Sequence, residues 1–219
     1  DGTSNLDVID VDGAANFAAD VTFADGADII TASAGTSNFR AGVNAGNSIE
    51  SGGNYNTVVG DEAGTAITTG DNNVAVGYTS LTANTTGASN VAVGANALDA
   101  NTTASNNVGI GLNAAGGTTT GANNIAIGTN SLLTNTTGAS NVSIGTYALN
   151  ANTTAANNTA VGTSALTANT TGTRNTAVGA LAGDANTEGN YNSAFGYNSL
   201  GANTTGTHNT ALGDYSQAA

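Results

Sequence analysis

Asn90-Val91-Ala92-Val93-Gly94 opens a unit of 17 residues that the chain repeats without interruption. The full copy at 90–106 reads N-V-A-V-G-A-N-A-L-D-A-N-T-T-A-S-N, and the same opening peptide stands one period earlier at 73–77. Ten units begin between residues 56 and 209, with no insertion or deletion. We number the positions of a unit 1–17 from the opening asparagine. A strict period of this kind indicates a repeat architecture in which each unit packs on its neighbours.

Position 1 is asparagine in all ten units. When identical units stack, the asparagine amides form a column and can hydrogen-bond from one unit to the next. We therefore expect an asparagine ladder. Its members are Asn56, Asn73, Asn90, Asn107, Asn124, Asn141, Asn158, Asn175, Asn192 and Asn209.

Positions 2–4 have the pattern of a short strand. Position 4 is always large and apolar, whereas position 3 is small in nine units, with Val58 as the exception. Positions 2 and 4 share one face of a strand and position 3 points to the other. We interpret position 4 as the core column, and position 3 as facing a second sheet or a neighbouring subunit. The predicted core residues are Val59, Val76, Val93, Ile110, Ile127, Ile144, Val161, Val178, Phe195 and Leu212.

The second half of the unit supplies a further apolar pair and a turn. Alanine and leucine recur at positions 8 and 9, as in Ala97-Leu98, and Asn-Thr-Thr-Gly follows, as in 84–87. Asparagine and glycine favour turns because they tolerate left-handed backbone conformations. Seventeen residues hold two short strands and two turns, whereas helical repeats need more than 30 residues. The sequence therefore predicts an all-β fold, a parallel β-solenoid whose coils lie about 4.8 Å apart.

Three regions follow from the pattern. Residues 1–37 lack the repeat and hold seven of the 15 acidic residues, so we expect a separate β segment that acts as a shaft or cap. Residues 38–55 resemble a degenerate first coil and junction, displaced by one residue from the 17-residue grid. Residues 56–219 hold the ten coils and a short C-terminal end. Solenoids commonly carry end units of different sequence.

Composition argues against several classes of partner. Arg40 and Arg174 are the only basic residues apart from one histidine, and the formal charge is −13. Binding to nucleic acid or to an anionic membrane surface needs a basic face, so neither is expected. No run of about 20 apolar residues is present to insert into a membrane. Cysteine is absent, which excludes disulfides and thiolate metal sites, and no cofactor is predicted.

The supply of core side chains is small for the length of chain that must be ordered. Burial of a large apolar side chain contributes about 1.5–3 kcal/mol. Ordering the backbone costs about 1–2 kcal/mol for each residue. Ladder hydrogen bonds and association must supply the difference. We therefore expect a homotrimer, intertwined or side by side, in which the small position-3 residues lie against partner chains.

The pattern Asn-x-Ala-Val-Gly…Ala-Leu…Asn-Thr-Thr-Gly, clearest at 90–94 and 124–128, resembles the head repeats of trimeric autotransporter adhesins. It is also similar to repeat tracts of phage and algal-virus tail fibres. The resemblance covers about residues 38–215. It implies a left-handed parallel β-roll, trimerised about a long axis and located outside the cell or on a virion.

These features predict a structural or adhesive fibre segment, not an enzyme, that spaces or presents a receptor-binding tip. The expected partners are further copies of the chain and a host surface glycan or protein. One alternative is an ice- or surface-binding solenoid built on the threonine columns, and another is a glycosylated filament subunit. A polysaccharide-degrading solenoid is not favoured, because carboxylates are sparse in the coils.

Individual residues offer few chemical sites. His208 stands in a turn position without a second histidine or a cysteine, so a surface role is favoured over a metal or catalytic one. Asp7, Asp10 and Asp12 are weak candidates for a calcium site, since they lack the spacing of a calcium loop. We favour solvated charges at a sheet edge. The six tyrosines fit either sugar contacts or subunit seams, and the sequence does not choose between them.

Asn-Thr-Thr is also a glycosylation sequon. As a turn it has a sufficient backbone reason to recur, so glycosylation is the secondary reading. The candidate acceptors are Asn84, Asn101, Asn135, Asn152, Asn169 and Asn203, with Asn141 as a seventh.

Overall fold

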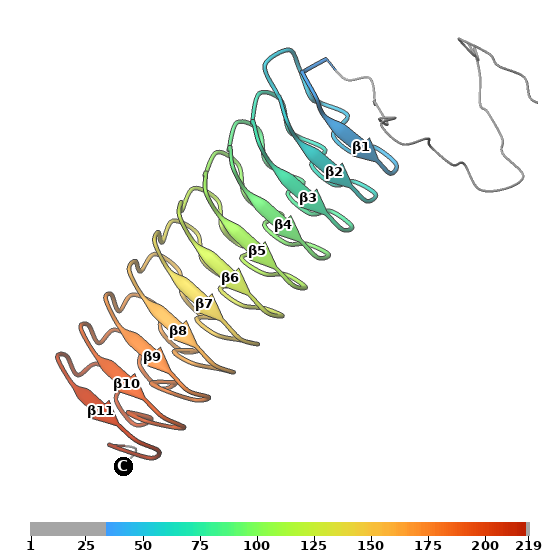
Figure 1. Cartoon of the computed structure of the whole chain (residues 1–219). Coiled ribbons are helices and arrows are strands. Elements are labelled where there is room, and N and C mark those ends of the chain that lie inside the picture. The colour runs from blue at the N-terminus through green and yellow to red at the C-terminus, as the bar shows by residue number, and fades with distance from the viewer. Residues whose placement is uncertain (1–33, 218–219) are drawn as a thin grey trace, which may run out of the picture.

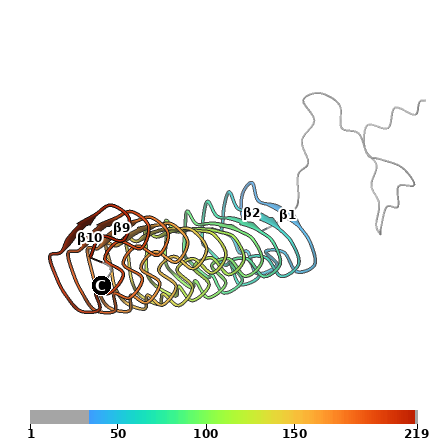
Figure 2. The same cartoon turned by 90° about the horizontal axis from the view of Figure 1, so that it is seen from below.

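The computed structural model describes residues 34–217, which form one β-solenoid of stacked coils (Figure 1). Each coil contributes one three-residue strand to a single parallel sheet in chain order. The strands are β1 Phe39–Ala41, β2 Thr57–Val59, β3 Val74–Val76, β4 Val91–Val93, β5 Val108–Ile110, β6 Ile125–Ile127, β7 Val142–Ile144, β8 Thr159–Val161, β9 Thr176–Val178, β10 Ser193–Phe195 and β11 Thr210–Leu212. The coils follow one another along one axis without a break (Figure 2).

The strand register repeats the sequence period. Val74 pairs with Val91 and Val91 with Val108, so each position lies beside the same position of the next coil. The first coil is longer by one residue, because Phe39 pairs with Thr57. The segment predicted at 1–37 and the candidate calcium ligands Asp7, Asp10 and Asp12 fall almost wholly outside the described residues, which begin at 34.

Each coil closes through left-handed backbone at positions 7, 9 and 17. In the coil of Leu98, the φ angles are 55° at Asn96, 51° at Leu98 and 62° at Asn106. Asparagine tolerates this region, but leucine is strained there. Leu98 is nevertheless fully buried. Burial of the side chain offsets a strain that an exposed leucine would not withstand.

Glycine at position 5 is required by backbone contact between coils. Gly94 has φ of 135°, and a Cβ added there would lie 2.6 Å from the carbonyl oxygen of Gly111. Such a distance is far inside van der Waals contact, so the column is closed to any side chain. This explains why position 5 is glycine in all ten units.

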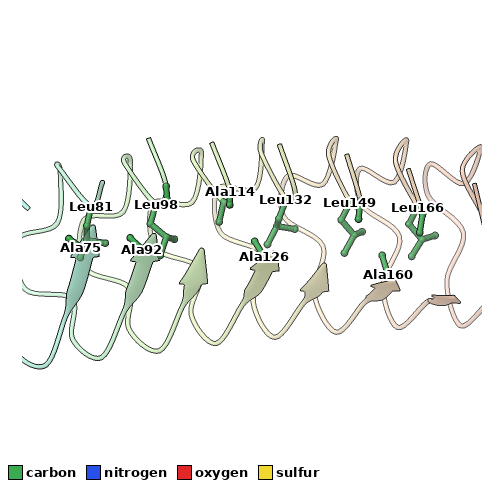
Figure 3. Close-up of a cluster of buried hydrophobic side chains, with 14 of the residues drawn as sticks. Ala75, Leu81, Ala92, Leu98, Ala114, Ala126, Leu132, Leu149, Ala160 and Leu166 are labelled. Atoms are coloured by element: carbon green, nitrogen blue, oxygen red, sulfur yellow. The ribbon is translucent and has the colours of Figure 1, made fainter. Parts of the chain in front are cut away.

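The interior of the solenoid is narrow and lined by small residues. The position-3 alanines, such as Ala92 and Ala126, are fully buried, and so are the leucines of position 9, such as Leu98 and Leu132. Figure 3 shows the leucines projecting from the opposite wall of the coil towards the alanines on the strands. The predicted second apolar contribution from Ala-Leu pairs is confirmed, since Ala97 and Leu98 have no exposed surface.

The core assignment of position 4 was wrong. The position-3 residue points into its own coil, so it does not lie against a partner chain as expected. The position-4 side chain points out of the coil and is half-exposed or exposed. Strand alternation divides the residues between two faces but does not say which face is inside. The interior already holds the leucine of position 9 and the asparagines of positions 1 and 12, so only a small residue fits at position 3. The residues placed outside are Val59, Val76, Val93, Ile110, Ile127, Ile144, Val161, Val178, Phe195 and Leu212.

Large side chains inside the coil are exchanged between positions 9 and 12. In the first two coils position 9 is glycine, and isoleucine at position 12 fills the space. A Cβ on Gly64 would lie 2.8 Å from the Cδ1 atom of Ile67, and one on Gly46 would lie 2.9 Å from the Cδ1 atom of Ile49. Most later coils have leucine at position 9 and asparagine at position 12. Each of these coils therefore holds one large aliphatic side chain in its interior, which belongs either to position 9 or to position 12.

The position-1 asparagines form a continuous buried ladder. In every coil from Asn56 to Asn209 the asparagine backbone N–H donates to the Oδ1 atom of the preceding asparagine, over 2.8–3.0 Å. The Nδ2 group donates to the position-15 carbonyl, as from Asn73 to Gly87 at 2.9 Å. The side-chain amides thus provide hydrogen-bond partners for backbone N–H and carbonyl groups outside the strands, as buried polar groups require.

A second ladder runs along position 12. Asn152 Nδ2 donates to Asn135 Oδ1 at 2.9 Å and to the Ala155 carbonyl at 3.1 Å, and neighbouring coils repeat the pattern. The sequence predicts a turn at this column, whereas its side chains point into the coil. Its regular exchange with isoleucine, at Ile49 and Ile67, was the available signal, because isoleucine marks an interior position.

Candidate interaction surface

The outer face of the sheet carries an unbroken row of side chains, which we call the outer strip. It consists of positions 2 and 4 of the ten coils from β2 to β11. Position 2 is Thr57, Val74, Val91, Val108, Ile125, Val142, Thr159, Thr176, Ser193 and Thr210, and position 4 is the set corrected above. Several apolar members are substantially exposed, with 37% for Ile110 and Ile125 and 36% for Ile144. The strip therefore presents β-branched side chains to the outside from β2 to β9.

No charged residue occurs in the outer strip, although the chain as a whole is strongly acidic. With a coil spacing of about 4.8 Å and a length of about 10 Å for a three-residue strand, the strip covers roughly 500 Å², part of which is contributed by Thr and Ser at position 2. The largest apolar patch on a typical monomer is about 300–600 Å², and such patches are often functional. The strip lies at the upper end of that range and is also continuous and straight.

The strip changes character at its C-terminal end. Position 4 becomes Phe195 in β10 and Leu212 in β11, which are 39% and 80% exposed. Tyr197 follows Phe195 by two residues and packs edge-on against Tyr215, with ring centroids 5.2 Å apart. Electrostatic interaction with Tyr197 is the main cause that raises the pKa of the Tyr215 phenol. Exposed large side chains therefore gather in the last two coils.

His208 takes part in an aromatic stack at position 17. Its ring lies parallel to that of Tyr191, with centroids 4.8 Å apart and planes inclined by 12°. The Arg174 guanidinium lies 5.3 Å from the centroid of the Tyr191 ring, and its Nη1 atom donates to the Tyr191 hydroxyl. All three residues are exposed. The stack joins three successive coils, and its geometry is that of surface packing between turns.

All the candidate glycosylation sites except Asn203 are fully buried in the folded coil, which counts against glycosylation there. Asn84, Asn101, Asn135, Asn152 and Asn169 have no exposed surface. Asn203, in the last coils, is half-buried and donates to Asn186 and Gly206. Asn141 belongs to the position-1 ladder and is also fully buried. A glycan on any of these amides would remove a ladder bond and would have to pass through the wall of the coil.

The threonine pairs divide between two roles. The position-13 hydroxyl donates to a backbone carbonyl of the next coil, as from Thr85 to Thr102 at 3.1 Å. The position-14 threonines, such as Thr86 and Thr103, are exposed. Only one threonine hydroxyl of each pair is thus left for an outside ligand. A two-column array of the kind expected for ice binding is not formed by these pairs.

Ionisable groups are scattered over the described coils. Burial raises the pKa of Asp99 and of Asp184 above the ordinary value, and hydrogen bonds from backbone amides oppose part of the shift. Both residues occupy position 10, and they lie five coils apart. The repeats contain no column of histidine or cysteine residues. Within residues 34–217, no three His, Cys, Asp or Glu side chains gather as a metal site would need.

Comparison with known proteins provides no family for the chain. No protein-family model, no curated protein and no solved structure matches it. No helix in residues 34–217 is long and apolar enough to span a membrane.

Proposed function

We propose that this chain is a structural and adhesive segment of a homotrimeric extracellular fibre, as in a tail fibre or surface adhesin. Three copies would pack through their outer strips around a common axis. The observation that carries the proposal is the uncharged strip of β2 to β11, in which every position-4 residue and half of the position-2 residues are apolar. Cyclic symmetry places the three copies parallel, so that like coils lie at the same height.

Electrostatics supports further copies of the chain as the occupants of the strip. Copies with a charge of −13 repel one another wherever their carboxylates come close. The strip holds no carboxylate, so it is the surface on which approach costs least. A copy also offers a matching row of valine and isoleucine with the same spacing. The position-4 residues would then become core residues of the trimer, although they lie outside the single coil.

The role follows from the shape and from the chemistry of the coils. Eleven strands at about 4.8 Å give a rod of roughly 48 Å. Its coils are closed by backbone ladders and bear no gathered catalytic groups within the described residues. Such a rod spaces or presents a receptor-binding tip that contacts a host glycan or protein. Antibodies against the coils should label the outside of intact cells or particles, and labelling only after lysis would contradict this location.

The oligomeric state tests the central claim. Sedimentation equilibrium should give three times the chain mass of 21.0 kDa. Ile144→Glu should dissociate the trimer, because an unpaired charge would be buried in its centre, while the exposed side chain leaves the coil itself intact. Thr120→Glu is the matched control, since Glu188 already occupies the same position in another coil. A monomeric native chain, or equal effects of the two variants, would refute the proposal.

A further inference from the structure

A trimer built on the outer strip faces a problem of register, because successive coils are almost alike. Position 4 is valine or isoleucine in eight successive coils from Val59 to Val178. If one copy slides by a single coil, valine meets isoleucine or valine again. Exchanges of this kind between similar aliphatic side chains cost little. The repeated part of the strip therefore specifies that copies associate, but only weakly at which height.

A slipped arrangement has a structural consequence. When each copy is displaced by one coil relative to its neighbour, the third copy does not meet the first at the same height. Heterologous contacts that do not close in this way generate open strings and not discrete rings. A trimer of defined length thus needs a feature that distinguishes the flush arrangement from its neighbours.

The last two coils hold that feature. We propose that Phe195 and Leu212 form a register lock, at which the three copies of this chain meet their own counterparts. This inference rests on the proposed trimer. Phe195 is the only aromatic residue among the strip positions of β2 to β11. Leu212 lies in β11, the last described strand, where no further strand covers it, and is 80% exposed.

Flush packing and slipped packing differ most at these two residues. In the flush trimer three Phe195 rings lie at one height, where contacts between aromatic rings add to the stabilisation from simple burial. After a slip of one coil, Phe195 of one copy meets Val178 of its neighbour, and one Leu212 loses its cover. The same end carries Tyr197 and Tyr215, whose contact holds the turn beside the lock.

Engineered cysteines can report the register, because the chain contains no cysteine. Two chains with different tags are co-expressed. One carries Val93→Cys, and the other carries either Val93→Cys or Ile127→Cys. The assembled protein is then oxidised in a glutathione buffer, in which disulfides form reversibly. Positions 93 and 127 are two coils apart, about 9.6 Å along the axis. That displacement exceeds the Cα separation of a disulfide, which is at most about 7 Å. In the locked trimer only links between like positions, 93–93 or 127–127, should form.

The test variant is Phe195→Val with Leu212→Val, which gives both coils the residue that position 4 most often carries. We expect 93–127 links to rise roughly tenfold, the population change that a loss of about 1.4 kcal/mol produces. Species larger than a trimer should appear with them. Tyr55→Asn is the control, since it removes an exposed aromatic side chain at a position where asparagine is common. Circular dichroism verifies that each variant keeps its coils.

The outcomes separate the two proposals. A native chain that is monomeric and forms no links overturns the trimer and the lock together. A trimeric double variant that keeps the native pattern of links overturns the lock alone. If the double variant keeps its register but loses binding to a glycan array, the C-terminal residues form a ligand site and the lock is again refuted.

Discussion

Thr118→Asn should stabilise the solenoid by repairing a gap in the position-12 ladder. Among the described residues, Asn101 Oδ1 is the only buried side-chain nitrogen or oxygen atom without a hydrogen-bond partner. The next coil has Thr118 where most coils have asparagine, so no amide donates to Asn101. Thr118 does accept a bond of 3.3 Å from Asn135. An unsatisfied buried acceptor costs about 1–3 kcal/mol.

The surroundings of Thr118 leave room for the larger side chain. The same coil has Ala115 at position 9, where most coils have leucine, and Gly109 at position 3, where most have alanine. An asparagine at position 118 would donate to Asn101 Oδ1, as Asn152 donates to Asn135 at 2.9 Å. We expect the free energy of unfolding to rise by about 1–2 kcal/mol. The melting temperature should rise by about 2–4 °C for each kcal/mol.

Thermal and urea unfolding followed by circular dichroism measure the effect. Asn101→Ala supplies the second arm of a double-mutant cycle. It should cost about 1 kcal/mol more in the Thr118→Asn background than in the native chain, because only there does Asn101 Oδ1 have a partner. Thr118→Val, which keeps the shape of threonine and removes its hydroxyl, should not stabilise. An additive cycle, or a Thr118→Asn variant less stable than the native chain, would refute the ladder argument.

Three further predictions concern the coil interior and pH. Asn124→Ala should lower the free energy of unfolding by about 2–4 kcal/mol, since the next asparagine loses the acceptor of its backbone N–H and a cavity remains; a cost below 1 kcal/mol in urea unfolding would contradict the ladder. Leu98→Gly combined with Asn101→Ile should lower the free energy of unfolding by less than the sum of the two single changes, because the two N-terminal coils already combine glycine at position 9 with isoleucine at position 12. A double-mutant cycle measures this, and additive effects would contradict the exchange between the two positions. Because the pKa values of Asp99 and Asp184 are raised, the folded state binds more protons than the unfolded state just above pH 4. Stability should therefore increase as the pH falls through these raised pKa values, and a chain with Asp99→Asn and Asp184→Asn should lose that part of the pH dependence.

The repeat predicted the architecture because a solenoid is governed by local, periodic contacts. Identical positions must lie beside one another when coils stack, so the strand register, the glycine column and the position-1 asparagine column can be inferred from spacing alone. The same reasoning could not orient the strand. Val93 and Ala92 alternate in either case, and hydrophobicity favoured the wrong one as the core residue. The candidate glycosylation sites failed for a related reason, because a turn motif does not say whether Asn101 points in or out.

Taken by itself, the sequence determined a 17-residue coil, a parallel β-solenoid and the repetitive composition of its surface. The tertiary structure decided which residues lie inside. A coil of 17 residues encloses too little volume for valine or isoleucine on the strand in addition to the buried leucine and two asparagines. The alanines therefore turn inward, and the large strand residues form the apolar strip on which the proposed fibre depends.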